Sequence, residues 1–174
     1  IFEQGPKKLV LFDHSEYALY AILQELQQKS ANTSTDIDIH AILGSVTDKQ
    51  RVEQLLQNMS PDTVFHAAAY KHVPLVEENM FEGIKNNLFG TLTLSQAAID
   101  AGVKKFVLIC NDKAVRPTNI VGASKRLAEL VLQALSTTQT KTIFAMVRLG
   151  NVLDSSGSVV RYFANRLKLA GRSL

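Results

Sequence analysis

The chain has 174 residues, a length that allows one compact domain with a hydrophobic core. Apolar residues make up 46% and charged residues 20%, and no apolar run reaches the roughly 18 residues of a membrane-spanning helix, so we expect a globular domain without a membrane segment. The formal net charge is only +3, and the basic residues are scattered without interleaved aromatic residues, which argues against a nucleic-acid partner.

Apolar runs alternate with helical patterns along the whole chain. In chain order, the patterns predict a strand at 9–12, a helix at 15–29, a strand at 37–43, a helix at 48–58 with Asp48 as its N-cap, and a strand at 63–68. They then predict helices at 74–83 and 84–101, a strand at 106–110, a helix at 119–135, a strand at 142–149 and a final helix at 158–170. Strands separated by helices indicate an α/β fold, with a doubly wound parallel sheet covered on both faces.

The two ends of the sequence are abrupt. Residues 1–6 resemble the end of a helix, with Gly5 and Pro6 as stop signals, and residues 171–174 contain no recognisable terminator, so we expect a fragment of a longer protein. The first residues do not show the basic and then apolar pattern of a signal peptide. The single cysteine, Cys110, excludes an internal disulfide and fits a reducing, cytoplasmic compartment.

Asp13 directly follows the first predicted strand. In dinucleotide-binding sheets, an acid at this strand end hydrogen-bonds the adenosine ribose and disfavours a 2′-phosphate. The alternative is an N-cap for the next helix, a role equally open to Ser15. The nine glycines contain no Gly-x-Gly-x-x-Gly arrangement, so a cofactor domain would have its first strand and Gly-rich phosphate loop upstream of Ile1.

The segment after the third predicted strand offers several candidate ligand contacts. Residues 66–69 read His-Ala-Ala-Ala, which either lets the backbone approach a flat ligand or packs a strand–helix junction. Lys71 and His72 follow at the carboxyl edge, where open α/β sheets bind ligands, or else they are solvated loop residues. Asn86 and Asn87 lie in a helical pattern that disfavours asparagine, so they either bind a backbone carbonyl or water near the site or are exposed.

The chemically richest stretch follows the fourth predicted strand. Asp112 and Lys113 place a carboxylate and an amine side by side, where they either serve acid–base chemistry or form a surface ion pair. Lys125 has Val121 four residues before it, where short-chain dehydrogenases place a Tyr on the same helix face. Residues 155–158 either hold an anion at the start of the last helix or form an ordinary loop. Because no His, Cys, Asp or Glu set has metal-ligand spacing, we expect no metal.

Five segments in a fixed order carry a resemblance to a known family. They are LVLFDHSEYALY (9–20), FHAAAYKHVPLVEE (65–78), NNLFGT (86–91), NDKAVRPTNIVGASKR (111–126) and VRLGNVLDSSGSV (147–159). The chain resembles the extended short-chain dehydrogenase/reductases, and more closely the polysaccharide-biosynthesis branch that contains UDP-N-acetylglucosamine 4,6-dehydratases. The resemblance implies a Rossmann-type sheet lacking its first strand and Gly-rich loop. It makes residues 1–150 a partial NAD-binding domain and residues 151–174 the start of a nucleotide-sugar lobe.

The resemblance also implies an activity. It indicates an NAD-dependent 4,6-dehydratase, a lyase that converts UDP-N-acetylglucosamine or a similar UDP-N-acetylhexosamine to a 4-keto-6-deoxy sugar for surface polysaccharide or glycan biosynthesis. Lys113 would be the base for the carbon 5 proton, and Asp112 the acid for the departing carbon 6 hydroxyl. Lys125 would bind the nicotinamide ribose and lower neighbouring pKa values. Asp13 would select NAD over NADP.

The implied site residues form three groups. The catalytic group is Asn111, Asp112, Lys113 and Lys125. The cofactor-binding group is Asp13, Ser45, Val46, Ala67, Ala68, Ala69, Lys71, Asn87 and Lys125. The substrate-binding group is Lys71, His72, Asn151 and Ser158.

Three positions depart from the family pattern. Val121 replaces the usual Tyr, Asn111 replaces a Ser or Thr that bonds the carbon 4 oxygen, and Ser45 replaces an Asp that contacts adenine. Two alternatives therefore stay open: a nucleotide-sugar 4-epimerase, which needs no carbon 5 base, and a non-catalytic nucleotide-binding or assembly domain. We also expect a homo-oligomer, and larger members of the branch carry a membrane region that would hold the parent protein at the inner face of a bacterial membrane.

Overall fold

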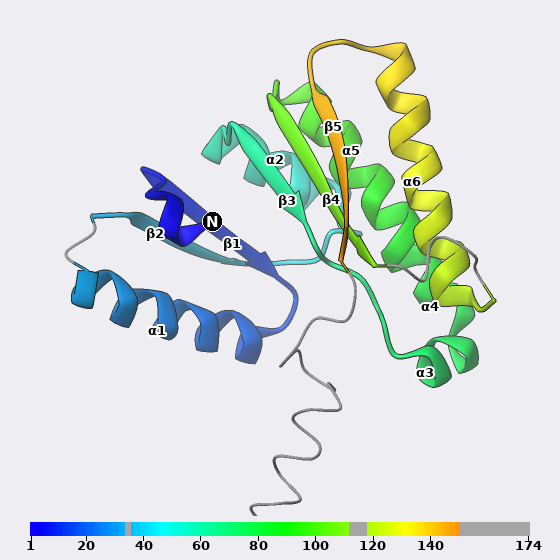
Figure 1. Ribbon diagram of the computed structural model, residues 1–174, viewed down its shortest axis with the longest axis horizontal. Coiled ribbons are helices and arrows are strands. Elements are labelled where there is room, and N and C mark those ends of the chain that lie inside the picture. Colours follow the sequence, from blue (N-terminus) through cyan, green and yellow to red (C-terminus); the bar gives the residue numbers. More distant parts are fainter. Residues whose placement is uncertain (34–35, 112–117, 150–174) are drawn as a thin grey trace, which may run out of the picture.

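The computed structural model describes residues 1–33, 36–111 and 118–149, and it builds them around parallel strands (Figure 1). The strands are β1 (Lys8–Asp13), β2 (Asp38–Leu43), β3 (Thr63–His66), β4 (Lys105–Asn111) and β5 (Ile143–Leu149). β1 pairs with β2, and β3, β4 and β5 pair in that order, always in parallel. The predicted parallel α/β fold is confirmed.

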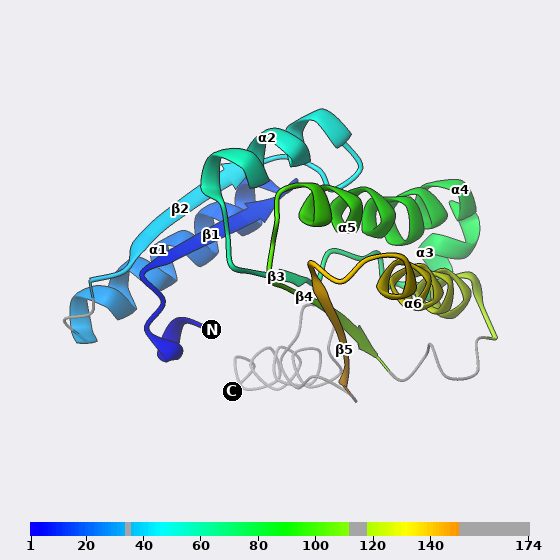
Figure 2. The same cartoon turned by 90° about the horizontal axis from the view of Figure 1, so that it is seen from above.

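Helices cover the strands from two sides. The helical segments are η1 (Phe2–Gln4), α1 (Glu16–Thr33), α2 (Lys49–Met59), α3 (Val73–Glu78), α4 (Met80–Ile84), the π-helical turn η2 (Lys85–Phe89), α5 (Gly90–Asp100) and α6 (Ile120–Thr138). Figure 2 shows α2, α5 and α6 on one side of the strands and α1 on the other. This is the doubly wound arrangement that the sequence predicts, because each parallel connection crosses over through a helix.

Polar side chains fix where the longer helices begin. Asp48 accepts a hydrogen bond from the Arg51 backbone N–H at 3.0 Å, so the predicted N-cap of α2 is confirmed. Asn119 accepts from the Gly122 N–H at 2.9 Å at the start of α6. At the start of α1, the Ser15 hydroxyl accepts from the Ala18 N–H at 3.2 Å. Of the two candidate caps for α1, Ser15 is therefore the one that reaches the third helical N–H.

The core lies between β4 and the helices α2, α5 and α6. Phe106, Leu108 and Cys110 alternate along β4 toward this side, and each is at most 5% exposed. They pack with residues from the three helices, namely Val52, Leu56, Leu94, Ala97, Ala98, Ala128 and Leu132. The Phe106 ring also meets the Phe144 ring of β5, with ring centroids 5.5 Å apart. This packing holds β4 against the middle of α6, at Ala128 and Leu132.

Two predicted helices are interrupted. The pattern at 74–83 divides at Asn79, whose backbone (φ −128°, ψ 51°) leaves the helical region between α3 and α4. The pattern at 84–101 begins with the π turn η2 before α5 starts at Gly90. A Cβ at Gly90 would lie 2.8 Å from Val46 Cγ2, so the glycine allows α5 to pack closely on the loop after β2.

None of the helices in the described ranges is long and apolar enough to cross a membrane. The same ranges contain no group of three His, Cys, Asp or Glu side chains that could hold a metal ion. The predicted helix at 158–170 lies outside the described residues.

Candidate functional site

The carboxyl ends of β1, β2 and β3 meet around a cavity of about 170 Å³. Its lining includes five of the residues predicted to bind a cofactor, namely Asp13, Val46, Ala67, Ala68 and Ala69. Gly44 lies in the same wall, where a Cβ would be 2.6 Å from the Phe12 ring, so no larger residue fits without displacing it. Ligands of open α/β sheets bind at this edge, and the position agrees with that rule.

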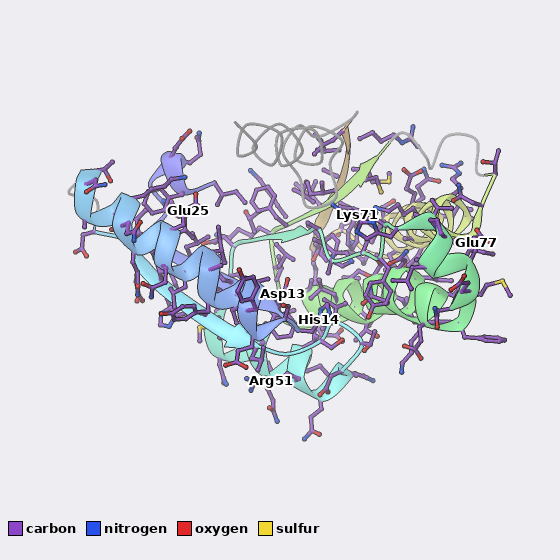
Figure 3. The ribbon with its side chains drawn as sticks, turned by 90° about the horizontal axis from the view of Figure 1, so that it is seen from below. Asp13, His14, Glu25, Arg51, Lys71 and Glu77 are labelled. Carbon is purple, nitrogen blue, oxygen red and sulfur yellow. The ribbon has the colours of Figure 1, made fainter. Side chains whose placement is uncertain are left out.

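Asp13 has one carboxylate oxygen committed to the protein. Its Oδ1 accepts from the Ser15 N–H at 2.8 Å and lies 3.6 Å from Nδ1 of His14. Within the described part of the chain, Oδ2 makes no hydrogen bond, and the Asp13 side chain is 46% exposed. Figure 3 shows Asp13 and His14 near the centre of the molecule, with Lys71 on the neighbouring loop. The N-cap of α1 is Ser15, so Asp13 is not needed for that role. The second oxygen of Asp13 is therefore available to a ligand.

Asn87 ties the loop at 67–70, called the alanine loop here, to α6. Its Oδ1 accepts from the Tyr70 N–H (2.7 Å) and from Asn86 Nδ2 (3.2 Å). Its Nδ2 donates to the Tyr70 carbonyl and to Ser124 Oγ, both at 3.1 Å. These four bonds use the full capacity of the amide, and Asn87 is only 2% exposed. Both asparagines are buried, so the exposed alternative is wrong for the pair, and binding of a backbone carbonyl is confirmed for Asn87 alone. A direct contact of Asn87 with a cofactor stays a prediction.

Lys125 lies next to this junction, on the first half of α6. It is 9% exposed, and its positive charge acts on His66 at the end of β3 and on Cys110 of β4. Burial, followed by the Lys125 charge, lowers the pKa of His66 to about 4, so the ring is neutral at pH 7 and pairs with Thr91 Oγ1 at 2.9 Å. Val121, one turn before Lys125, is completely buried.

A second cavity of about 500 Å³ adjoins the first one at Ala69 and Tyr70. Lys71 and His72, the two predicted substrate residues within the described ranges, line it together with Leu75 and Val76 of α3. Mostly apolar walls with a few convergent polar groups are typical of small-molecule sites. Five of the nine predicted cofactor residues thus line the first cavity, and Lys71 and His72 line its neighbour, while the roles of these residues stay predictions.

Other predicted residues lie elsewhere. The Ser45 hydroxyl bonds Thr47 Oγ1 at 2.8 Å and accepts from the Thr47 N–H at 3.2 Å, in the turn after β2, and Ser45 does not line the first cavity. Asn111 is the last residue of β4, opposite Leu149 of β5. Its side chain lies outside the described residues, as do the predicted site residues Asp112, Lys113, Asn151 and Ser158.

The sequence pattern missed an ionic cluster at the carboxyl end of β5. Glu129 of α6 is completely buried and accepts from Arg148 of β5 through both Nε (2.9 Å) and Nη2 (2.7 Å). Arg126 adds a third bond at 2.8 Å. The Arg148 guanidinium holds the pKa of Glu129 below its usual range. The sequence feature that could have indicated this cluster is Glu129, the single charged residue within the apolar run at 127–132.

Comparisons with known proteins agree with this arrangement. Two curated relatives are the capsular polysaccharide biosynthesis protein CapD of Staphylococcus aureus (43% identical; 95% of this chain, 27% of the relative) and a UDP-N-acetylglucosamine 4,6-dehydratase (inverting) of Campylobacter jejuni (32%; 97% and 48%). A UDP-glucose 4-epimerase of Rickettsia canadensis is also 32% identical (91% and 47%). The crystal structure of Pen from Bacillus thuringiensis matches with a TM-score of 0.81 (36% identical; 95% and 49%).

The chain spans about a quarter to a half of the length of these relatives. The profile of a single family, described as "Polysaccharide biosynthesis protein", matches residues 1–173. This match includes the strand ends around the first cavity, the alanine loop and the α6 turn that carries Lys125. An agreement of this extent shows that the chain belongs to the family of polysaccharide biosynthesis proteins.

Proposed function

We propose that the protein is an NAD-dependent nucleotide-sugar 4,6-dehydratase that acts on UDP-N-acetylglucosamine or a similar UDP-N-acetylhexosamine. The observation that carries the proposal is the junction made by Asn87, which joins the alanine loop at the strand-end cavity to the α6 turn bearing Lys125. The relative named as a 4,6-dehydratase supports the reaction type.

The residues around the first cavity fit the adenosine end of NAD. The available oxygen of Asp13 can accept hydrogen bonds from ribose hydroxyls, and its charge disfavours a 2′-phosphate. The three alanines present only methyl groups to the cavity, which lets a flat group lie close to the backbone. When bound, NAD⁺ supplies the hydride acceptor and donor for the sugar carbons.

The other chemical roles belong to side chains of this chain. Lys125 would donate hydrogen bonds to the nicotinamide ribose. It follows Ser124 on α6, and Ser124 accepts a hydrogen bond from Asn87. Lys113 would remove the carbon 5 proton, and Asp112 would give a proton to the carbon 6 hydroxyl as water leaves. Lys71 and His72 in the second cavity, with Asn151 and Ser158, would contact the UDP-sugar. Residues 151–174 would begin the sugar-binding lobe.

The main alternative is a nucleotide-sugar 4-epimerase, which the Rickettsia relative favours. An epimerase uses the same cofactor but does not eliminate water, so it needs no acid–base pair at carbons 5 and 6. The position of Val121 bears on both enzymes, because its buried methyl groups cannot take part in proton transfer from the carbon 4 hydroxyl. We further propose a homo-oligomer that works in the cytoplasm or at the inner face of the membrane.

The reaction is tested with the full-length gene product, UDP-N-acetylglucosamine and NAD⁺ in deuterated water. A dehydratase gives a product that has lost water and gained solvent deuterium at carbon 5. An epimerase gives an isomer of unchanged mass without deuterium at carbon 5. If neither UDP-N-acetylglucosamine nor a similar UDP-N-acetylhexosamine changes by mass spectrometry, with fully folded protein, only the non-catalytic alternative is left. Lys113→Ala should abolish the deuterium uptake, while the matched exposed variant Lys29→Ala should not.

A further inference from the structure

Glu129, Arg126 and Arg148 form an ionic cluster that takes no part in the proposed dehydration reaction. Both oxygens of Glu129 are engaged, Oε1 by Arg148 Nε and Oε2 by Arg148 Nη2 and Arg126 Nη1. Paired, parallel N–H···O bonds of this kind fix orientation as well as distance. The carboxylate is completely buried, whereas the two arginine side chains are 40% and 45% exposed.

The cluster joins two elements at a defined place. Arg148 lies one residue before the end of β5, opposite Cys110 of β4. Glu129 lies four residues after Lys125, so the two side chains project from the same face of α6 one turn apart. Burial raises the pKa of the Cys110 thiol, and the charges of Lys125, Glu129 and Arg148 act on the same thiol.

Stability alone does not account for an ionic pair here. Removing a carboxylate from water is costly, and replacing such a pair with packed apolar side chains is often neutral or stabilising. What an apolar pair does not reproduce is the fixed, directional connection between a helix and a strand end. Lys125 and Asn111, which lies opposite Leu149 at the end of β5, both belong to the predicted catalytic group, so the position of α6 relative to this strand end affects the proposed chemistry.

We propose that Glu129 is a positioning residue: by clamping Arg148, it fixes the carboxyl end of β5, from which the chain continues to residues 150–174, relative to Lys125 on α6. The inference rests on the proposed function only for its consequence in turnover. A misplacement of about 1 Å between reacting groups can cost about 100-fold in rate. Loss of the clamp should therefore lower kcat more than it changes cofactor affinity.

The first test uses the full-length protein and needs measurable turnover of UDP-N-acetylglucosamine. Glu129→Gln should lower kcat about 10- to 100-fold, with KM for the sugar nucleotide and Kd for NAD⁺ within about threefold. The double variant Glu129→Met with Arg148→Met should fold with a Tm near that of the wild type and show the same kcat loss. Wild-type kcat in the double variant would overturn the proposal, because packing alone would then suffice.

The second test reports on position without turnover, so failure of the proposed function leaves it intact. In hydrogen exchange on the full-length protein, Glu129→Gln should speed exchange at residues 147–149 by about tenfold and leave β1 unchanged. Glu25→Gln, which removes the same charge from an exposed helical pair with Lys29, is the matched control and should change neither. Unchanged exchange at the end of β5 in Glu129→Gln would refute the clamp.

Discussion

Replacing Asn87 with alanine removes the junction between the alanine loop and α6. The change removes the oxygen that accepts the hydrogen bond of Asn86 Nδ2, and Asn86 is only 8% exposed. A buried polar group left without a partner costs about 1–3 kcal/mol. It also frees the N–H and carbonyl of Tyr70, which is 39% exposed, so water recovers part of those two bonds and the loss is about 0.5–1.5 kcal/mol each. Ser124 Oγ keeps its bond to the Val121 carbonyl.

The sum is a destabilisation of about 2–6 kcal/mol, which corresponds to a Tm decrease of roughly 4–24 °C for a chain of this size. Urea and thermal unfolding measure it directly. The matched control is Asn79→Ala, because Asn79 donates only one exposed bond to the Leu75 carbonyl (2.9 Å) and should cost less than about 0.5 kcal/mol. If both variants lose the same small amount of stability, the four bonds of Asn87 do not hold the site together.

Three further predictions concern pH, packing and the cofactor. Because the pKa of His66 is lowered from 6.5 to about 4 in the folded state, the unfolded chain binds the proton first; the stability this gives is present above pH 6.5 and is lost as the pH falls toward 4. The His66→Gln variant should therefore lose less stability than the wild type between pH 6.5 and pH 4, by up to roughly 3 kcal/mol. Urea midpoints that are equal for the variant and the wild type at each pH would contradict this. Gly90→Ala should destabilise by about 1–3 kcal/mol, although alanine favours helices, because its Cβ meets Val46; a raised Tm would count against the close packing. In the full-length protein, Asp13→Asn should weaken NAD binding about 10- to 100-fold by calorimetry, and an unchanged Kd would remove Asp13 from the site.

Local patterns were sufficient to predict the strands and the helix starts. The apolar run of β4 is flanked by charged residues, and Asp48 and Asn119 stand directly before helical patterns, so the information lies within a few residues of each boundary. The clustering of Asp13 with the alanine loop also followed from the sequence, because carboxyl ends of parallel strands share one edge of a sheet.

Features that depend on distant contacts were not predictable in the same way. The π turn η2 lies where Asn87 bonds Tyr70, 17 residues away, and Ser124, 37 residues away. The spacing of apolar residues along the helix therefore does not predict this turn. The partner of Glu129 is 19 residues further along the chain, on a different element. A buried charge in an apolar helix requires a partner, but the sequence does not say which one.

The contacts of Asn87 with Tyr70 have a consequence for how the site can change. Asn87 holds only the main-chain N–H and carbonyl of Tyr70, while Tyr70 itself lines both cavities. The hydrogen bonds that Asn87 makes to the loop therefore do not involve the side chain at position 70, whose ring instead meets the His14 ring edge-on with centroids 6.3 Å apart. A substitution at this position can alter the shape of both cavities while the bonds to Asn87 remain, which makes it a natural point for shifting ligand preference during evolution or engineering.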